Sequence, residues 1–427
     1  MSATPRPIPR LRVETSRVDD LKLLIPLLHP RHPLLWIRKG QGIAGVGEAL
    51  RLEFSGPTRM LDACAVWKDV VAAASVSDPI ALPGSGLVAF GTFAFADDSA
   101  AVSTLIVPQV VLGKRDGQFW ITRVVAEWPA GAVDAAGQPL RTVPTPVLSP
   151  RPLGPEYRIT LLPGTVSADA FRASVDAAVD RIAAQELEKV VLARDLVAHL
   201  PEGADLRRPL TDLALGYPDC WTYAVDGFIG SSPETLVRVS RGAVSARVLA
   251  GTTARGADAE ADHDRAVALA TSTKDLDEHG FAVNSVVAAL APHSRTLTTS
   301  ELPFTLKLPN LWHLASDVEG TLSDGSTSLD LIAALHPTAA VAGTPTAVAL
   351  ELIHELEPFD RGRYAGPVGW VGADGDGEWA VALRSAQVDA VGDITAYAGC
   401  GIVADSEPER EYLETKMKFR PIVEAFG

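Results

Sequence analysis

The chain has 427 residues, of which 47% are apolar and 21% are charged, a composition that excludes a mainly disordered protein. Its 38 basic and 53 acidic residues give a net charge of −15, which disfavours nucleic acids and anionic membrane surfaces as partners. An anionic substrate would need a local cation to bind to such a protein.

The cysteines and the apolar stretches indicate where the protein works. Cys64, Cys220 and Cys400 are too few and too scattered for a disulfide framework or a zinc site, which favours a reducing compartment. Residues 21–37 are apolar but are interrupted by prolines and charged residues. Since a spanning helix needs about 18 uninterrupted apolar residues, we predict a cytoplasmic protein.

The part of the chain before residue 158 is predicted to hold a tail, a strand-rich half and a connector. Residues 1–15 are typical of a flexible tail. Within 16–128, the stretches 86–95 and 103–113 have the composition of strands. Seven prolines fall between residues 129 and 155, so 129–157 is predicted to be a surface connector, which can join two halves of one core.

The remainder, 158–427, alternates runs of strands with helices. Ser167 can cap a helix whose apolar residues recur at helical spacing. Further predicted elements are strands at 188–200, 221–240 and 242–256, a long helix over 260–292, two strands within 378–404, and a closing helix over 407–426. Strands in runs favour an α+β fold over strict βαβ alternation.

Two acidic helix faces are candidates for a metal site. In EYLETKMK, helical spacing places Glu411, Glu414 and Lys418 on one face, and in STKDLDEH it does the same for Asp275 and Glu278. Each face is equally consistent with a solvated helix surface. Together they could hold Mg²⁺, which takes one or two protein carboxylates and leaves its other positions to water and substrate oxygens.

Two single residues are candidates for proton transfer. The turn SSPE places Glu234 at a strand edge, where an apolar setting would raise its pKa and make it a general acid. An exposed turn glutamate is the alternative. Lys189 begins an apolar strand, and its amine would become a usable base if buried there. A lysine at a strand end can instead reach solvent.

The other candidates are single turns and side chains. Arg384, in a predicted strand, could pair with a carboxylate or lie on a sheet face. His313 and His336 are expected to be core histidines. Three turns suggest backbone brought close to a ligand, although ordinary turns explain each one; they contain Gly251, Gly366, Gly369, Gly399 and Gly401.

Taken in order, ten motifs resemble the chorismate-utilising enzymes, a family that includes isochorismate synthase, salicylate synthase, anthranilate synthase component I and aminodeoxychorismate synthase. The motifs are KVVLAR, SSPETLV, LAGTTARG, KDLDEH, LWHLASDVEGTL, LHPTAAVAGTP, GPVGW, ALRSA, GCGIVADSEPE and EYLETKMK. The resemblance is dense over 160–427. Earlier it is loose, and WIRKGQGIAGVGEA at 36–49 resembles the menaquinone-type enzymes.

The resemblance implies a large α+β fold of two halves, in which mostly antiparallel sheets pack together with helices outside, and makes 158–427 the chorismate-binding catalytic region. It also implies Mg²⁺ and the dianionic substrate chorismate. Glu278 and Glu414 would bind the ion, with Glu411 and Asp275 around them. Residues that would bind or surround the substrate are Gly251, His313, Ala340, Tyr364, Arg384, Gly399, Gly401 and Lys418.

Two positions resemble the branch of the family that uses water. The ammonia-using members carry Gln where this chain has Lys189, and the aminodeoxychorismate type carries Lys where this chain has Ala250. Lys189 is thereby implied as the base that activates water for attack on ring C2, and Glu234 as the acid that protonates the departing C4 hydroxyl. The implied activity is that of an isochorismate synthase, an isomerase of menaquinone or siderophore biosynthesis.

The alternatives are a salicylate synthase, which adds loss of pyruvate and uses the same lysine and glutamate, an ammonia-using synthase component, and a non-catalytic ligand-binding homologue. Lys189 disfavours the second, and the complete set of site residues disfavours the third. We expect a monomer that needs no glutaminase subunit and has no nucleic-acid or membrane partner.

Overall fold

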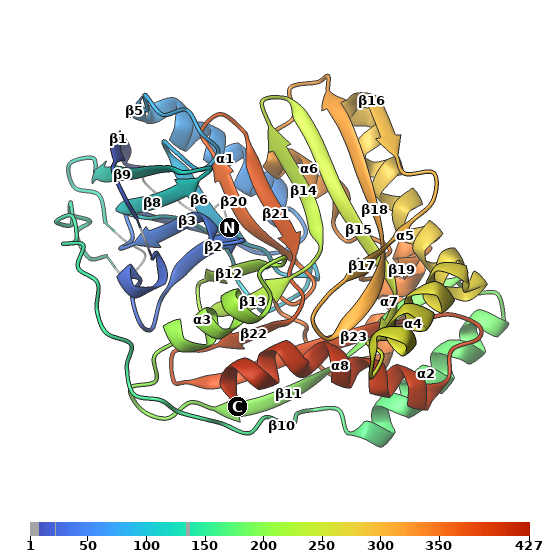
Figure 1. The fold of residues 1–427 in the computed structure, drawn as a ribbon. Coiled ribbons are helices and arrows are strands. Elements are labelled where there is room, and N and C mark those ends of the chain that lie inside the picture. The colour runs from blue at the N-terminus through green and yellow to red at the C-terminus, as the bar shows by residue number, and fades with distance from the viewer. Residues whose placement is uncertain (1–7, 22, 134–136) are drawn as a thin grey trace.

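Two large sheets lie at the centre of the molecule, and helices cover their outer sides (Figure 1). The computed structural model describes residues 8–21, 23–133 and 137–427. Neighbouring strands in both sheets run antiparallel, apart from β1 and β5, which pair in parallel. This arrangement confirms the predicted α+β fold with mostly antiparallel sheets.

The larger sheet takes strands from both sides of the predicted connector. In the described part of the chain it has thirteen strands. Their order is β10 (Leu162–Pro163), β11 (Lys189–His199), β23 (Asp393–Ile402), β22 (Ser385–Val388), β13 (Phe228–Ser232), β12 (Trp221–Val225), β2 (Leu34–Arg38), β3 (Gln41–Val46), β8 (Val110–Arg115), β9 (Gln118–Glu127), β1 (Arg10–Val18) and β5 (Ser75–Ser77), with β19 (Gly343–Thr344) beside β11.

The smaller sheet also combines early and late strands. Ten strands of the described residues belong to it. Their order is β16 (Ser294–Thr299), β18 (Leu311–Leu322), β15 (Ala243–Ala254), β14 (Thr235–Ser240), β21 (Gly377–Val381), β20 (Pro367–Gly372), β6 (Val88–Thr92), β7 (Ser103–Val107) and β4 (Leu50–Phe54), with β17 (Phe304–Lys307) beside β18. Neither sheet is therefore complete without both halves of the sequence.

Large aromatic side chains fill part of the core between the sheets. Trp36, Trp120 and Tyr223 come from the larger sheet, and Phe90 and Trp370 come from the smaller one; all five belong to one buried cluster. Removing such apolar surface from water is the main stabilising contribution to packed sheets. The two halves of the chain are thus held together by a shared core.

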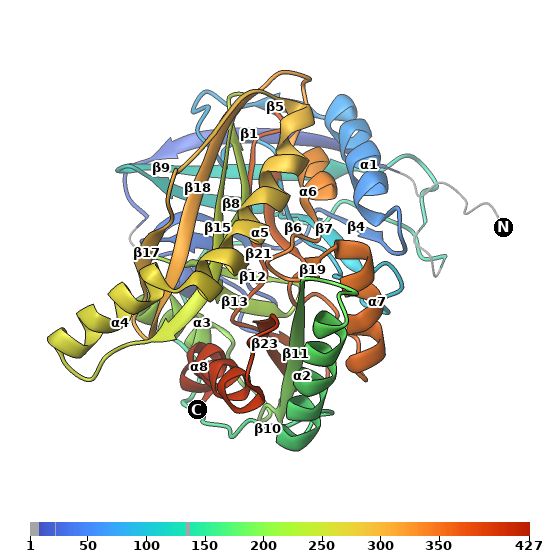
Figure 2. The same cartoon turned by 90° about the vertical axis from the view of Figure 1, so that its right-hand side faces the viewer.

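Helices lie on both sides of this pair of sheets. α5 packs against β15 and β18 and α8 packs against β23, while α4 projects from the body of the molecule (Figure 2). None of the helices in the described residues is both long and apolar enough to cross a membrane. The helices are α1 (Arg59–Ala73), α2 (Ala168–Ala183), α3 (Arg207–Gly216), α4 (Ala259–Thr271), α5 (Thr273–Leu290), α6 (Ser328–Leu335), α7 (Thr346–Leu356) and α8 (Pro408–Phe426), with short 3₁₀ turns at Ile25–Leu27 and Ala291–His293.

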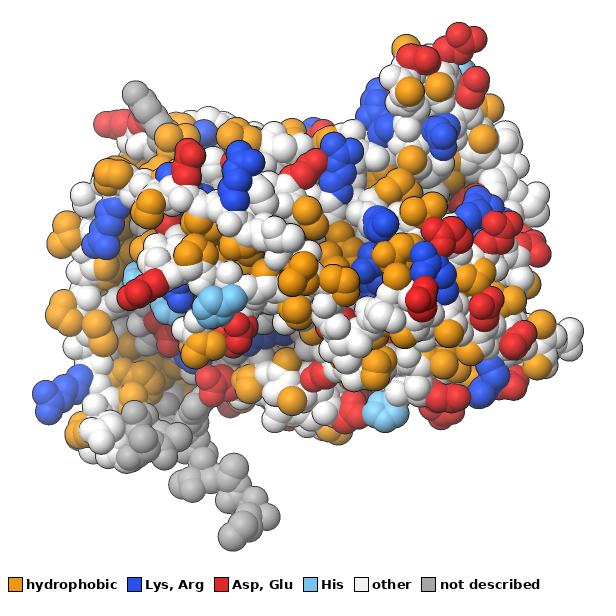
Figure 3. Space-filling model, turned by 90° about the horizontal axis from the view of Figure 1, so that it is seen from below, with side chains coloured by type: hydrophobic (Ala, Val, Ile, Leu, Met, Phe, Trp, Pro, Cys, Tyr) orange, Lys and Arg blue, Asp and Glu red, His pale blue; other side chains and the backbone are white. Residues whose placement is uncertain are grey.

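The surface carries both signs of charge. Acidic and basic side chains are interspersed over the face seen from below, with apolar atoms between them (Figure 3). The net charge of −15 is therefore not gathered into a single-sign patch on this face.

The predicted helix after Ser167 is confirmed as α2. The Ser167 hydroxyl accepts a hydrogen bond from the backbone N–H of Ala170 and so caps the helix. The residues predicted to share one face are the buried residues of this helix: Phe171, Val175, Ala178 and Ile182.

The predicted tail was wrong for residues 10–15, which belong to β1. Leu11, Val13 and Thr15 alternate with exposed residues and are buried against the neighbouring strand β9. This period of two is the pattern of a strand with one buried face, and the proline-rich start of the chain concealed it. Residues 1–7 lie outside the described residues.

Two predicted elements are divided by single residues. The stretch 103–113 forms two strands, β7 and β8, because Pro108 between them cannot donate a ladder hydrogen bond. The long helix over 260–292 is two helices, α4 and α5. Ser272 ends the first and caps the second, since its hydroxyl accepts a hydrogen bond from the N–H of Asp275.

The segment 378–404 forms three strands rather than two. The predicted turn between β22 and β23 is present, but a second break follows Val381, where the chain leaves the smaller sheet for the larger one. Arg384, predicted on a strand, lies in this break with a positive φ of 50°. The described residues of this connector, 129–133 and 137–157, belong to none of the helices or strands named above, and the proposed division of the chain there stays a prediction.

Candidate active site

The site lies where the chain crosses between the two sheets. β13 leads into β14 through Pro233 and Glu234, and β21 leads back to β22 through Arg384. The hydroxyl of Ser232 donates to the carbonyl of Val381 at 2.6 Å, and the N–H of Val381 donates to the carbonyl of Glu234 at 3.2 Å. These bonds hold the two crossings side by side, so that Glu234 and Arg384 enter the same space.

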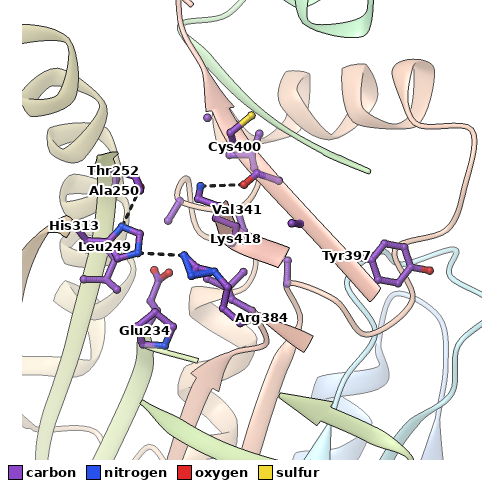
Figure 4. Close-up of a pocket in the computed structure, with 18 of the residues that line it drawn as sticks. Glu234, Leu249, Ala250, Thr252, His313, Val341, Arg384, Tyr397, Cys400 and Lys418 are labelled. Atoms are coloured by element: carbon purple, nitrogen blue, oxygen red, sulfur yellow. Dashed lines mark hydrogen bonds between the residues drawn. The ribbon is translucent and has the colours of Figure 1, made fainter. Parts of the chain in front are cut away.

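A cavity opens at these crossings, and most of the residues predicted from the sequence line it (Figure 4). Lys189, Asp275, Glu411 and Glu414 lie next to it rather than on its surface. The predicted residues on its wall are Glu234, Gly251, Glu278, His313, Ala340, Tyr364, Arg384, Gly399, Gly401 and Lys418. The fold therefore brings together residues spread from position 234 to position 418 of the sequence.

Glu234 is a buried carboxyl group, not an exposed turn residue. The residue is 4% exposed. Burial raises its pKa to about 8, although a backbone hydrogen bond at Leu249 and the charges of Lys189 and Arg384 act in the opposite direction. Glu234 is therefore largely protonated at neutral pH and can donate a proton.

Lys189 is fully buried at the start of β11, which excludes a side chain that reaches solvent. Its Nζ lies 3.1 Å from Oε1 of Glu278 but forms no well-aligned hydrogen bond within the described residues. An amine in such a position is poised to bind a further polar partner.

Two of the predicted glycines are required by close approach. Gly251 has a φ of 80° and forms an irregularity between β15 and β18, and a Cβ there would lie 3.1 Å from the Cβ of Asp275. A Cβ at Gly401 would collide with Glu278 and lie 2.9 Å from Cε of Lys189. Both positions let the backbone approach side chains of the candidate site.

His313 orients Arg384. Arg384 Nη2 lies 3.1 Å from Nε2 of His313, and because a guanidinium can only donate, this ring nitrogen must accept. The other ring nitrogen, Nδ1, then carries the proton and donates to Oγ1 of Thr252 at 2.9 Å. Burial, together with the charges of Arg384 and Lys418, holds the pKa of His313 well below its ordinary value, so the ring is neutral.

The prediction of core histidines is met differently at the two positions. His313 is buried and hydrogen-bonded, yet it also lines the cavity (Figure 4). His336 does not line this cavity. Its Nε2 lies 2.9 Å from the carbonyl oxygen of Phe95, and the side chain lines a separate hollow.

At the opposite end of the site, three glutamates each face a lysine. Lys418 also donates to the carbonyl of Gly399 at 2.9 Å (Figure 4). The i,i+4 pair predicted on α8 is thus present, and it lies beside the cavity rather than on a solvated surface. The three ion pairs are Lys189–Glu278 at 3.1 Å, Lys274–Glu411 at 3.2 Å and Lys418–Glu414 at 2.6 Å.

The carboxylates at this end repel one another. Burial and then the charge of Glu414 raise the pKa of Glu411. Burial and the charges of Glu278 and Glu414 likewise raise the pKa of Asp275, against a hydrogen bond from Ser272. A cation placed among these groups would relieve the repulsion.

The donor set fits the Mg²⁺ ion that the motifs imply. No three His, Cys, Asp or Glu side chains of the described residues converge closely enough to form a ready-made metal site. Mg²⁺, however, needs only one or two protein carboxylates and takes its other ligands from water and substrate. Glu278 and Glu414 supply hard oxygen donors beside the cavity, in a region where negative charges are crowded together.

Sequence reasoning did not single out several residues of the site. Thr252 supports His313, and its signal was only its place in a glycine-containing turn. Glu357 and Arg361 form a buried i,i+4 pair behind β11, with Arg361 in the cavity wall. Lys274 pairs with Glu411, and a lysine in the first turn of a helix was the signal that could have found it.

Comparison with known proteins agrees with this geometry. The family described as "Chorismate binding enzyme" matches residues 9–427. Isochorismate synthase DhbC of Bacillus subtilis is 41% identical over 286 residues, covering 64% of this chain and 71% of its own length. Isochorismate synthase MenF of Bacillus subtilis is 30% identical over 356 residues, covering 80% of this chain and 75% of its own.

A solved structure gives the same fold. MenF of Escherichia coli, the menaquinone-specific isochorismate synthase, superposes with a TM-score of 0.75 at 24% identity and covers 99% of this chain and 96% of its own. Because the family match spans nearly the whole sequence and includes every residue of the cavity, the chain belongs to the chorismate-binding enzyme family.

Proposed function

We propose that this protein is an isochorismate synthase, an isomerase that converts chorismate to isochorismate with Mg²⁺. The observation that carries the proposal is the combination of a buried, protonated Glu234 on the cavity wall and a buried amine, that of Lys189, next to the same cavity. An acid and a base are the two groups that exchange of a ring hydroxyl through water requires.

The cavity suits a dianion in spite of the acidic surface. Arg384 and Lys418 line it and supply two positive charges, and Tyr364 is buried in the same wall. We assign the enolpyruvyl carboxylate to Arg384, Tyr364 and the backbone at Gly399 and Gly401. His313 holds the guanidinium in place, so that little ordering is needed when the substrate binds.

Glu278 and Glu414 would hold the Mg²⁺ ion, with Glu411 and Asp275 around them. When bound, the ion supplies positive charge for the ring carboxylate of chorismate. The chain's own contribution is to place these carboxylates on α5 and α8. α8 packs against β23, the strand that carries Gly399 and Gly401, and Glu278 of α5 lies next to Gly401.

The proposed steps conserve atoms and charge. Lys189, acting as a neutral amine, takes a proton from a water molecule, whose oxygen bonds to ring C2. The ring double bonds shift, the C4–O bond breaks, and Glu234 gives its proton to the departing hydroxyl, which leaves as water. One water is consumed and one is released, so the product is an isomer of the substrate.

The nucleophile is water rather than ammonia in this proposal. Lys189 occupies the position at which ammonia-using members of the family carry Gln, and Ala250, on the cavity wall, provides no amine that could itself attack. Use of the product in menaquinone synthesis, a monomeric state, a cytoplasmic location and independence from a glutaminase subunit stay predictions.

The test is turnover of chorismate in water enriched in heavy oxygen. Isochorismate that carries the heavy isotope at C2 is expected, because the new hydroxyl comes from solvent, and the isotope separates product from its isomeric substrate by mass. Salicylate and pyruvate as main products would assign the salicylate synthase activity instead. Anthranilate formed on addition of ammonia would exclude the proposed hydroxyl transfer.

A further inference from the structure

Lys274 stands where the helix itself disfavours a lysine. It is the second residue of α5, directly after the cap Ser272 and the first helical residue Thr273. The N-terminal turn of a helix carries partial positive charge, so an ammonium there is destabilising unless other groups compensate. A residue that breaks a local rule in this way often serves function.

The compensation comes from the acidic end of the active site. Nζ of Lys274 lies 3.2 Å from Oε1 of Glu411, and the charges of Glu278 and Glu414 act on it as well as that of Glu411. On the inner side, the buried Nζ of Lys189 faces Glu278 without an aligned hydrogen bond. In this arrangement, the ammonium groups of Lys274 and Lys418 therefore balance Glu411 and Glu414.

The three lysines differ in how firmly they are held. Lys189 is fully buried, and Lys418 is 16% exposed and is also tied to the carbonyl of Gly399. The side chain of Lys274 is 25% exposed, and its ammonium pairs with Glu411. Lys274 is thus the lysine of the three that can withdraw with the least rearrangement.

A place for the withdrawn ammonium lies directly outside. Lys274 lines a surface hollow together with the exposed carboxylates of Glu188, Asp277 and Asp405. Around this hollow, these groups offer new partners to a lysine side chain with a flexible four-carbon stem. The hollow also presents negative charge to an approaching cation.

From these observations we infer that Lys274 is an exchangeable counter-ion. It neutralises the glutamates of the site until a divalent cation binds there, and its ammonium then moves outward to Glu188, Asp277 and Asp405. The inference rests on the proposed Mg²⁺ site and adds a competitor to it. Affinity for the ion is then set by a difference in free energy between two states: the carboxylates paired with the ammonium of Lys274, and the same carboxylates bound to the divalent cation.

The test is calorimetric titration of Mg²⁺ into the full-length protein without chorismate. Lys274→Met keeps most of the side-chain length and removes the charge, so it is expected to bind Mg²⁺ about tenfold more tightly or better than the wild type. Lys274→Arg keeps the charge and should stay close to the wild type. Lys68→Met, which removes an exposed lysine paired with Asp330, is the matched control and should leave the affinity unchanged.

Thermal unfolding of the same variants, with and without Mg²⁺, distinguishes a change in metal binding from a folding defect. In EDTA, Lys274→Met should melt below the wild type because its carboxylates are left unbalanced, and saturating Mg²⁺ should close this gap; Lys274→Gln should repeat both results. Equal or weaker Mg²⁺ binding by the two uncharged variants would overturn the inference while leaving the proposed function intact. A wild type that binds no Mg²⁺ and turns over chorismate in EDTA would remove both the metal site and the inference.

Discussion

The fold places the glutamates at the two ends of the cavity in different electrostatic surroundings. At the sheet crossing, Glu234 is buried away from any ion-pair partner within reach in the described residues, and its pKa rises to about 8. At the helix end, Glu278 and Glu414 each face a lysine within 3.1 Å. One residue type is thus the proposed proton donor in one place and the proposed metal ligand in the other.

The difference teaches that burial alone does not decide the charge of a carboxyl group. Glu411 is as buried as Glu234, since both residues are 4% exposed. Glu411 keeps a lysine at 3.2 Å, whereas Glu234 meets cations only at longer range. Nearby opposite charge favours the ionised form and desolvation opposes it, and the contacts supplied by the fold set the balance.

The largest effect should come from the acid–base pair. Glu234→Gln removes the proton donor and keeps the shape, so kcat should fall by about 10²–10⁴-fold or more, with the affinity for chorismate little changed. Lys189→Ala should cause a loss of similar size. Steady-state kinetics and chorismate titration check both variants, and near-normal kcat in Glu234→Gln would contradict its role as the acid.

The next largest effect is expected on Mg²⁺ affinity, at the helix end of the cavity. Glu414→Gln removes one negative charge beside the cavity, and Mg²⁺ affinity should fall by about 10–100-fold. Calorimetry measures this loss directly, while EDTA should abolish turnover of the wild type. Glu409→Gln, on the exposed side of the same helix, serves as the matched control and should bind Mg²⁺ normally. Turnover that persists in EDTA would contradict the metal assignment.

A smaller effect, on the KM for chorismate, is expected from changing the guanidinium of Arg384. Arg384→Lys keeps the charge but loses the planar fork and the bond to His313. The KM for chorismate should rise by about tenfold, with a smaller change in kcat. If KM is unchanged, Arg384 does not hold the substrate carboxylate.

The raised pKa of Glu234 predicts a pH dependence of both activity and stability. Activity should decline as pH rises through about 8, because the acid loses its proton. The folded protein keeps a proton that the unfolded chain releases near pH 4.5, so the contribution of Glu234 to stability falls between about pH 4.5 and about pH 8. Urea unfolding should therefore favour Glu234→Gln progressively over the wild type as pH rises, and a constant difference would contradict the assignment.

The smallest expected effect tests α5, the helix that carries Asp275 and Glu278 of the proposed metal site. Ser272→Ala removes the cap of α5 and should cost about 1 kcal/mol of stability. Thermal unfolding measures the loss, and Ser167→Ala on α2 provides a comparison at a helix without metal residues. No loss at Ser272 would mean that packing alone holds α5.

Local patterns carried much of the prediction. The strand that begins at Lys189, the turn at Glu234 and the closing helix over 407–426 were predicted from spacing and turn residues and are present in the structure. Two of the errors arose where a single residue redirects the chain. Ser272 divides one predicted helix into two, and the break at Arg384 sends the chain from one sheet to the other.

By itself, the sequence determined the local elements, the family resemblance and the identity of the candidate residues, because these depend on neighbours along the chain and on motifs. Only the tertiary structure decided which carboxyl groups are protonated and which are paired. Burial of Glu234, its distance from cations, and the meeting of α5 with α8 depend on contacts between segments far apart in sequence. Electrostatic free energies depend on such distances and on exclusion of water, and local sequence specifies neither.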